Sequence, residues 1–350
     1  MPRRKPRTRV EKSAQGGRHI PVLLALVIEA LRPTDGETYL DMTYGAGGYT
    51  RAILQAADCQ MVAFDRDPTA IADAEPARAE FGTRLKLLQE PFGNLLNKAQ
   101  DGAGGFAQCF DGVVFDLGVS SMQIDTPERG FSFQSDGPLD MRMSASSASA
   151  TEGPSAADVV NTYDEADIAD ILYGLAEERR SRAIAKAIVA RRQKEPFSRT
   201  LELAELVGTV LGRGPPGKHP ATRTFQALRM YVNDELGQLI QGLAGAERAL
   251  RPGGRLVVVT FHSIEDRIVK RFIATRSGKS KGVSRHMPTS IESLRPPSFQ
   301  IINSRSLTSS KAELEANPRA RSARLRAAVR TTDDPWPLDW SGLGVPQLKG

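Results

Sequence analysis

The chain has 350 residues, 40 % hydrophobic and 25 % charged, which is long enough for a sizeable core and ordinary for a globular protein. Its two cysteines, Cys59 and Cys109, lack the spacing of a metal site or a disulfide framework, which favours a reduced, cytoplasmic setting. No apolar run approaches the ~20 residues of a membrane span and none follows the basic N-terminus, so we expect neither a membrane segment nor a secretory signal.

The net charge of +6 is spread unevenly along the chain. Residues 1–18 carry seven Lys and Arg against one acid, lack hydrophobic periodicity and are expected to form a disordered basic arm. Residues 267–330 carry fifteen Lys and Arg against three acids, so the rest of the chain has a net charge of −12. Basic ends on an acidic body predict a polyanionic partner, although basic tails can also serve solubility.

The first chemical motif is an acid followed by a glycine loop. A short apolar strand ends at Asp41, and residues 45–48 read GAGG before a helical segment. Glycines permit positive φ and a close approach of backbone to a ligand. About 20 residues further on, Asp65 ends a second strand, where an acid in a βαβ unit hydrogen-bonds ribose hydroxyls. The spacing predicts a pocket for an adenosine-containing cofactor.

The loop also indicates which cofactor is bound. A dinucleotide fold requires G-x-G-x-x-G and a helix N-terminus that faces a pyrophosphate. Here the loop lacks that pattern, and Asp41 would repel a pyrophosphate but attract the ammonium group of a methionine moiety. The motif therefore favours S-adenosylmethionine over NAD.

Two more strands follow in the same alternation with helices. After the third, residues 85–88, Phe92 is placed either to stack on an adenine or to pack in the core. The fourth, residues 110–115, ends at Asp116. Because ligands of open α/β sheets bind at the carboxyl ends of strands, we expect Asp116 in the same crevice as Asp41 and Asp65.

The strand–helix alternation stops after Gln123. Residues 125–157 are rich in Gly, Pro, Ser and Asp, with residues 144–151 typical of a flexible linker, and helical segments follow. This pattern predicts a helical domain over residues 125–220, inserted between the fourth and fifth strands and covering the crevice.

The C-terminal part is expected to complete the sheet. A continuous apolar stripe predicts one long helix from Thr222 to a fifth strand at residues 256–260. His262 follows at the strand tip, where a lone histidine is more often structural than catalytic. Short strands are expected near Ile301 and Leu307, and residues 317–326 form a compact arginine cluster.

Several long motifs resemble one family. The segment LRPGGR at 250–255, with the glycine loop, resembles class I S-adenosylmethionine-dependent methyltransferases. A narrower set of motifs is similar to the small-subunit rRNA cytosine-N4 methyltransferases, the RsmH or MraW family. They are HIPVLL (19–24), FDRDP (64–68), DLGVSS (116–121), ERGFSF (128–133), GPLDMRM (137–143), RTFQALR (223–229), VNDEL (232–236), FHSIEDRIVK (261–270) and NPRARSARLR (317–326).

The resemblance covers roughly residues 19–330 and implies a fold, an activity and partners. The fold is a Rossmann-like class I methyltransferase sheet with an inserted helical domain: residues 19–124 and 221–330 form the methyltransferase domain, and 331–350 a flexible tail. The implied activity is methylation of the N4 amine of a cytosine in the decoding region, the P site, of 16S rRNA in the small ribosomal subunit. A homodimer is left open.

The resemblance also implies a set of cofactor contacts. They fall on Gly47, Gly48, Tyr49, Asp65, Phe92, Asp116 and Gln123. The chain departs from the family pattern at Tyr49, where many members have His, at Met122, which replaces a common Pro, and in a lengthened Ser/Ala stretch at 144–151.

The chemistry of the implied reaction singles out Asp116. A cytosine amine is a poor nucleophile, so an acceptor must hold its hydrogens and aim its nitrogen at the methyl group. Asp116, with the backbone of residues 117–118, is the candidate catalytic residue. Ring-carbon methylation would use a cysteine nucleophile, but neither cysteine follows the fourth strand. Two alternatives remain: a small-molecule methyltransferase, and an RNA-binding assembly factor on a methyltransferase fold.

Overall fold

The structure is a computed structural model that describes residues 21–100, 105–144, 153–212, 219–279 and 295–348. The predicted basic arm 1–18 and nearly all of the predicted linker 144–151 lie outside the described residues. In the described part of the chain, no helix is long and apolar enough to cross a lipid bilayer.

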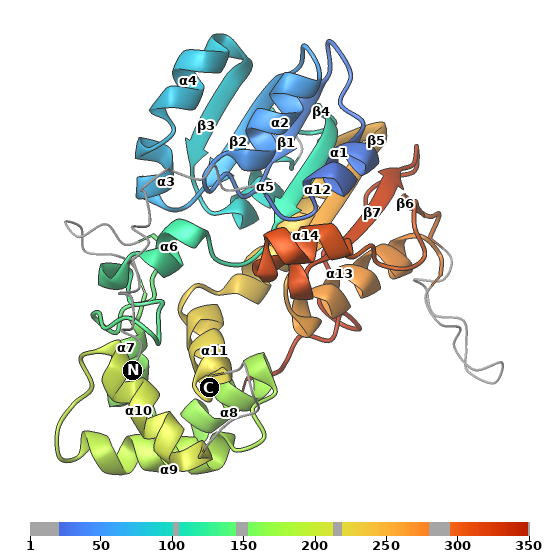
Figure 1. The fold of residues 1–350 in the computed structure, drawn as a ribbon. Coiled ribbons are helices and arrows are strands. Elements are labelled where there is room, and N and C mark those ends of the chain that lie inside the picture. Colours follow the sequence, from blue (N-terminus) through green and yellow to red (C-terminus); the bar gives the residue numbers. More distant parts are fainter. Residues whose placement is uncertain (1–20, 101–104, 145–152, 213–218, 280–294, 349–350) are drawn as a thin grey trace, which may run out of the picture.

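Within the described residues, seven strands form one sheet in the order β3-β2-β1-β4-β5-β7-β6 (Figure 1). They are β1 (Thr38–Asp41), β2 (Gln60–Asp65), β3 (Leu85–Gln89), β4 (Phe110–Asp116), β5 (Leu250–Thr260), β6 (Phe299–Ile301) and β7 (Arg324–Arg330). The strands from β3 to β5 run parallel, and β7 is antiparallel to both β5 and β6. The predicted Rossmann-like class is confirmed, and the strand order reverses between β1 and β4, where such sheets bind ligands.

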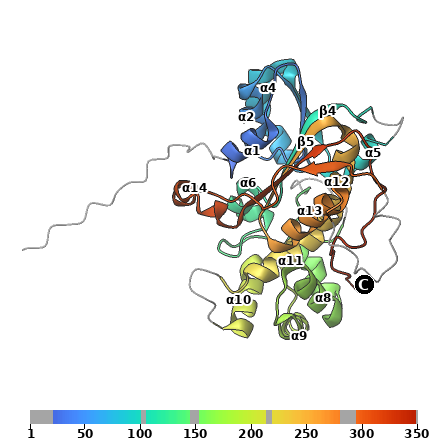
Figure 2. The same cartoon turned by 90° about the vertical axis from the view of Figure 1, so that its right-hand side faces the viewer.

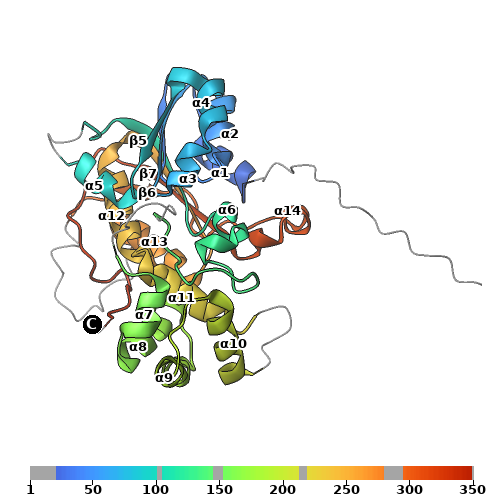
Figure 3. The ribbon, with the colours of Figure 1, turned by 90° about the vertical axis from the view of Figure 1, so that its left-hand side faces the viewer.

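Helices cover both faces of the sheet (Figures 2 and 3). One face carries α1 (Leu24–Leu31), α2 (Gly48–Ala56), α3 (Pro68–Ala72) and α4 (Glu75–Phe81); the other carries α5 (Leu95–Lys98), α12 (Glu235–Ala249) and α13 (Ser263–Arg276). Successive residues of a strand point to opposite faces of the sheet. Tyr39 accordingly belongs to the apolar cluster that includes α1 to α4, and Leu40 to the cluster that includes α5, α12 and α13. The central strands are therefore apolar on both sides.

The chain between β4 and α12 forms a group of helices below the sheet in Figure 1. After the short α6 (Ser121–Asp125) come α7 (Ala156–Thr162), α8 (Glu165–Ala176), α9 (Ser181–Arg192), α10 (Thr200–Leu211) and α11 (Thr222–Val232). Helix α11 packs against α7 and α8, so it joins this group by its contacts although it lies beyond residue 220.

The single long helix expected from Thr222 is wrong. The chain breaks at Asn233 and Asp234, where Asp234 has a φ of 46°, and α12 starts afresh. The side chain of Asn233 takes over the hydrogen bonds at this break, to the backbone of Met141, Met143 and Arg229. An apolar stripe that runs through both helices gives no sign of the break.

Strand β7, with the sequence RLRAAVR, was not predicted. Its first three residues belong to the segment that was interpreted as an arginine cluster. Arg326 is 9 % exposed and Arg330 4 %, and each has internal partners, which lets a strand with arginines lie inside the sheet. Residues 331–348, suggested by sequence as a loose tail, have no strand or helix, but Trp336 and Leu343 are buried against the body.

Candidate active site

A cavity of about 700 Å³ lies at the carboxyl ends of the central strands. Its lining includes the loop after β1, Asp65 and Asp116, together with residues 131–134 and one side of α11. Arg319 and Ser322, from the C-terminal part of the chain, complete its wall. A cavity of this size at the switch point of an α/β sheet suits an organic cofactor with room for part of a second molecule.

Two glycines of the glycine loop are required by neighbouring protein atoms, which leave no room for a Cβ. Gly47 has a φ of +74°, and a Cβ there would lie 2.6 Å from the Tyr44 hydroxyl. A Cβ on Gly48 would collide with the ring of Pro21. Gly45, with a φ of +52°, lines the cavity and has no atom closer than 3.9 Å to the place of a Cβ. The backbone at Gly45 is therefore the part of the loop most open to a ligand.

Asp65 lies at the end of β2, in the cavity wall. Its Oδ2 accepts the backbone N–H of Gly45 at 2.7 Å, and its Oδ1 accepts that of Asp67 at 2.8 Å. Burial raises the pKa of Asp65 to about 6, although both hydrogen bonds oppose the shift. The carboxylate is thus held in a fixed orientation beside the glycine loop.

Asp41 has a different environment. It is fully buried and does not line the cavity. Its Oδ1 accepts the N–H of Thr43 at 3.0 Å and its Oδ2 the hydroxyl of Thr50 at 2.7 Å, while burial raises its pKa. The expectation that Asp41 attracts the ammonium group of a ligand is therefore wrong, because this acid ties the loop to α2 from inside the protein.

Asp116 ends β4 and lines the cavity. Its backbone N–H donates to the hydroxyl of Thr43 at 2.7 Å. Its Oδ1 is buried without a hydrogen-bond partner among the described residues. Burial, and to a smaller extent the charges of Asp41 and Glu265, raises the pKa of Asp116 well above its usual range. A buried carboxylate oxygen without a donor is well suited to accept a hydrogen bond from a ligand.

The other predicted residues contribute walls and supports. The Tyr49 hydroxyl donates to the carbonyl of Val22, and the Phe92 ring packs edge-on against Phe115 with centroids 5.8 Å apart. Gln123 accepts the N–H of Ser120 at 3.1 Å and donates to Asp67 at 2.9 Å, so its side chain is held inside the protein.

The structure brings most of the predicted residues to one place. Six of the seven line the large cavity: Gly48, Tyr49, Asp65, Phe92, Asp116 and Gln123. Gly47 does not line it; this residue is the N-cap of α2 and packs on Tyr44.

Sequence reasoning did not single out the aromatic lining residues of the helical region. Phe133 stacks on His219, with ring centroids 4.9 Å apart, and meets Phe225 edge-on at 5.5 Å. His262 also lines the cavity, with its Nε2 2.9 Å from Oε1 of Glu265. The aromatic residues in ERGFSF were the available signal, but nothing in the sequence shows that this segment returns to the strand ends.

The arginines of the C-terminal cluster do not share one environment. Arg326 forms two hydrogen bonds with Asp266, at 2.7 and 3.1 Å, and Arg324 lies 3.6 Å from the same carboxylate. Arg319 is about half exposed at the cavity wall and pairs with Asp125 at 3.0 Å. Two further basic residues that could meet a polyanion, Arg213 and Lys218 before α11, lie outside the described residues.

The comparisons with known proteins agree over nearly the whole chain. A family model described as the MraW methylase family matches residues 16–331. A protein of Parvibaculum lavamentivorans named ribosomal RNA small subunit methyltransferase H is 55 % identical over 336 residues, which cover 95 % of this chain and 96 % of that protein. A Mesorhizobium japonicum protein of the same name is 54 % identical over 340 residues, covering 96 % and 95 % of the two chains.

Proposed function

Because the chain belongs to the MraW methylase family, as its motifs predict, we propose that it methylates the N4 amine of a cytosine in the decoding region of 16S rRNA. The chain is a methyltransferase, and S-adenosylmethionine is its cofactor. Action on small-subunit rRNA is carried over from relatives with that name. A substrate within the small ribosomal subunit implies a cytoplasmic location.

The residues of the large cavity fit the cofactor. The backbone of Gly45 and the carboxylate of Asp65 lie together, since they share a hydrogen bond, and suit the methionine part and the ribose hydroxyls. Phe92 offers an apolar surface for the adenine. When bound, S-adenosylmethionine supplies a methyl group already activated on a sulfonium. The protein therefore has mainly to align the acceptor amine.

The observation that carries the proposal is Oδ1 of Asp116 in the cavity wall, for which the described residues provide no hydrogen-bond partner. An acceptor at this position can hold an amino hydrogen of the cytosine and orient the nitrogen lone pair. Because burial raises the pKa of Asp116, its ionised form is a stronger base than an ordinary aspartate, and in that form it can take up the proton that the amine loses when it gains a methyl group. Thr43 fixes the backbone from which this carboxylate projects.

The cysteines support an amine rather than a ring carbon as the acceptor. Cys59 is fully buried, and its thiol lies 3.7 Å from the carbonyl of Ile53. Neither Cys59 nor Cys109 lines the cavity. A thiolate that adds to the pyrimidine ring, as carbon methylation needs, is therefore not available at this site.

The test is methylation of unmethylated 30S subunits with labelled S-adenosylmethionine, followed by mass spectrometry of the rRNA nucleosides. We expect N4-methylcytidine at one decoding-region cytosine, and a fall in turnover of about 100-fold or more for Asp116→Asn. Asp111→Asn, at the opposite end of β4, is the matched control and should keep most of the activity. Label in another nucleoside, or an Asp116→Asn variant as active as the parent, would contradict the proposal.

A further inference from the structure

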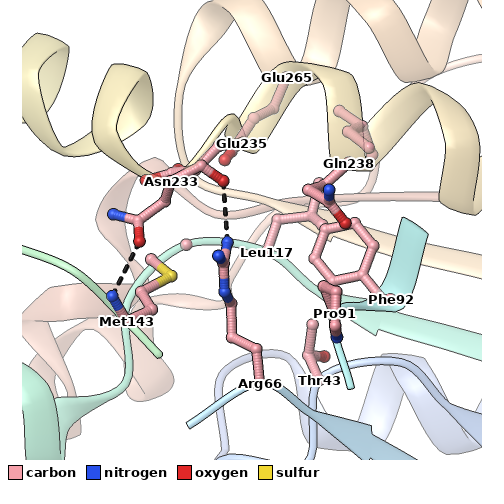
Figure 4. Close-up of a pocket in the computed structure, with 12 residues that line it drawn as sticks. Thr43, Arg66, Pro91, Phe92, Leu117, Met143, Asn233, Glu235, Gln238 and Glu265 are labelled. Atoms are coloured by element: carbon pink, nitrogen blue, oxygen red, sulfur yellow. Dashed lines mark hydrogen bonds between the residues drawn. The ribbon is translucent and has the colours of Figure 1, made fainter. Parts of the chain in front are cut away.

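A second, small cavity of about 40 Å³ adjoins the large one (Figure 4). Its base consists of residues at the ends of three strands: Arg66, Phe92 and Leu117, which also line the large cavity. Glu235 and Gln238, from the first turns of α12, line its other side. The volume has room for a few water-sized groups, and therefore for the polar edge of a base but not for a whole purine.

The position of this cavity relates it to the cofactor, so the inference rests on the proposed cofactor site. Arg66 directly follows Asp65, the residue that suits the ribose. A base attached to that ribose would reach Phe92, which follows the neighbouring β3, and its outer edge would then meet the small cavity. With the base ring in the large cavity, its hydrogen-bonding edge would face α12.

The two α12 side chains have opposite and fixed hydrogen-bonding character. Glu235 accepts two N–H groups from Arg229, at 2.6 and 2.8 Å, and its side chain is only 11 % exposed. Both oxygens of this carboxylate therefore act as hydrogen-bond acceptors. Gln238 uses its Oε1 to accept the N–H of Gly93 at 3.0 Å, which leaves its Nε2 as a donor. These residues are three apart, on one face of α12.

We propose that Glu235 and Gln238 are specificity-determining residues that recognise the adenine edge of the cofactor. The Glu235 carboxylate accepts a hydrogen bond from the exocyclic amine, and the Gln238 amide donates one to the adjacent ring nitrogen. A 6-oxopurine presents the reverse pattern, an oxygen acceptor beside a ring N–H donor. Both contacts are then lost and buried polar groups are left unpaired, so such a base is rejected.

A metal ion is the competing occupant of this region. Oxygen and nitrogen atoms of Glu235, His262 and Glu265 lie within 4.8 Å of one another. Basic side chains already lie against these acids, however, because Arg229 is bonded to Glu235 and the His262 ring lies 2.9 Å from Glu265. Glu265 also accepts the backbone N–H of Phe261 at 2.9 Å, so its oxygens serve the start of α13.

The test compares two ligands that differ only at the purine edge, S-adenosylhomocysteine and S-inosylhomocysteine, by calorimetric titration of the full-length protein. The parent should prefer the adenosyl ligand by about 100-fold or more. Gln238→Glu keeps an oxygen for the N–H of Gly93 but turns the donor into an acceptor. This variant should bind the inosyl ligand more tightly than the parent does. Its preference for the adenosyl over the inosyl ligand should be smaller than that of the parent by about tenfold or more.

Glu235→Gln is the second variant and should also narrow the preference, because its amide can donate to a 6-oxo group. Asp65→Asn is the matched control, and it should weaken both ligands by the same factor since both contain the ribose. Unchanged preference in both α12 variants, with melting temperatures near that of the parent, would overturn the inference and leave the methyltransferase function intact. A parent protein that binds neither ligand would instead overturn the cofactor site itself, and the inference with it.

Discussion

Three carboxylates end three neighbouring strands, and their immediate contacts give them three different properties. Asp41 is enclosed by Thr43 and Thr50, whereas Asp65 is held by backbone N–H groups at the cavity wall. Asp116 keeps a buried oxygen that finds no partner in the described part of the chain. Spacing in the sequence predicts all three strand-end positions, because the alternation of strands and helices sets them. It does not predict which carboxylate faces the cavity, because that depends on the hydroxyl groups nearby.

The raised pKa of Asp65 predicts opposite pH trends for ligand binding and for stability. Below about pH 6 the buried carboxyl of the free protein is protonated and loses acceptor strength, so the affinity for S-adenosylhomocysteine should fall by up to about tenfold per pH unit. A folded-state pKa above the unfolded one also means that this group stabilises the free protein at low pH. That contribution is lost as the pH rises through about 6.

Calorimetric titrations and thermal melts between pH 4.5 and 7.5 measure both trends. Asp65→Asn is the control, because an amide cannot titrate, and its affinity and stability should lose this component of the pH dependence. Affinity that is constant across this range in the parent would show that Asp65 does not contact the ligand as an ionised acceptor.

At the scale of elements, the strands were easier to predict from sequence than the break between α11 and α12. Short apolar runs that end at or near an acid identified β1 to β4, but the apolar stripe through residues 222–249 predicted a single helix. The break depends on Asn233, which is only 2 % exposed. Its Oδ1 accepts the N–H of Met143 at 2.8 Å, and its backbone carbonyl accepts Arg66 (Figure 4). These contacts join segments far apart in the sequence, which no local pattern reveals.

Asn233→Ala should therefore be strongly destabilising. It removes three side-chain hydrogen bonds and leaves the N–H of Met143 and the carbonyl of Met141 buried without that partner. We expect the free energy of unfolding to fall by about 2–5 kcal/mol, measured by urea denaturation. Asn303→Ala is the matched control, since Asn303 is partly exposed in a loop, and it should cost about 1 kcal/mol or less. Equal losses in the two variants would show that Asn233 is not the element that fixes the break.

At the scale of the whole molecule, the sequence reveals total charge but not which charges reach the surface. Glu247 and Arg276 form an ion pair at 2.6 Å that is almost completely buried. Glu247 also accepts the backbone N–H of Trp336, which fastens residues 331–348 to the body. Arg326 likewise forms a buried ion pair with Asp266. The basic C-terminal region is thus partly a set of internal supports, and only its exposed members are free to meet a polyanion.

This division gives a prediction for RNA binding. Arg319 and Arg321 are exposed, and Arg319 lies at the wall of the cavity, whereas Arg326 is buried against Asp266. If the exposed pair contacts phosphates, the double variant Arg319→Ala, Arg321→Ala should weaken binding to 16S rRNA. It should also lower the slope of log affinity against log salt by about 0.7–0.9 for each lost contact. Its melting temperature should change little, because exposed ion pairs such as Arg319 with Asp125 contribute about 1 kcal/mol or less.

Arg326→Ala is the matched comparison and should behave in the opposite way. It leaves the Asp266 carboxylate with only the more distant Arg324, so the protein should lose about 3–5 kcal/mol of stability. The fraction that remains folded should bind RNA with the parent salt slope, because this guanidinium is not available to a phosphate. A double variant with the parent slope would exclude Arg319 and Arg321 from the RNA contact. Among the described residues, the RNA contact would then be expected on the helical region instead. The first candidate there is Arg223, whose guanidinium lies at the surface beside the carbonyl of Glu177.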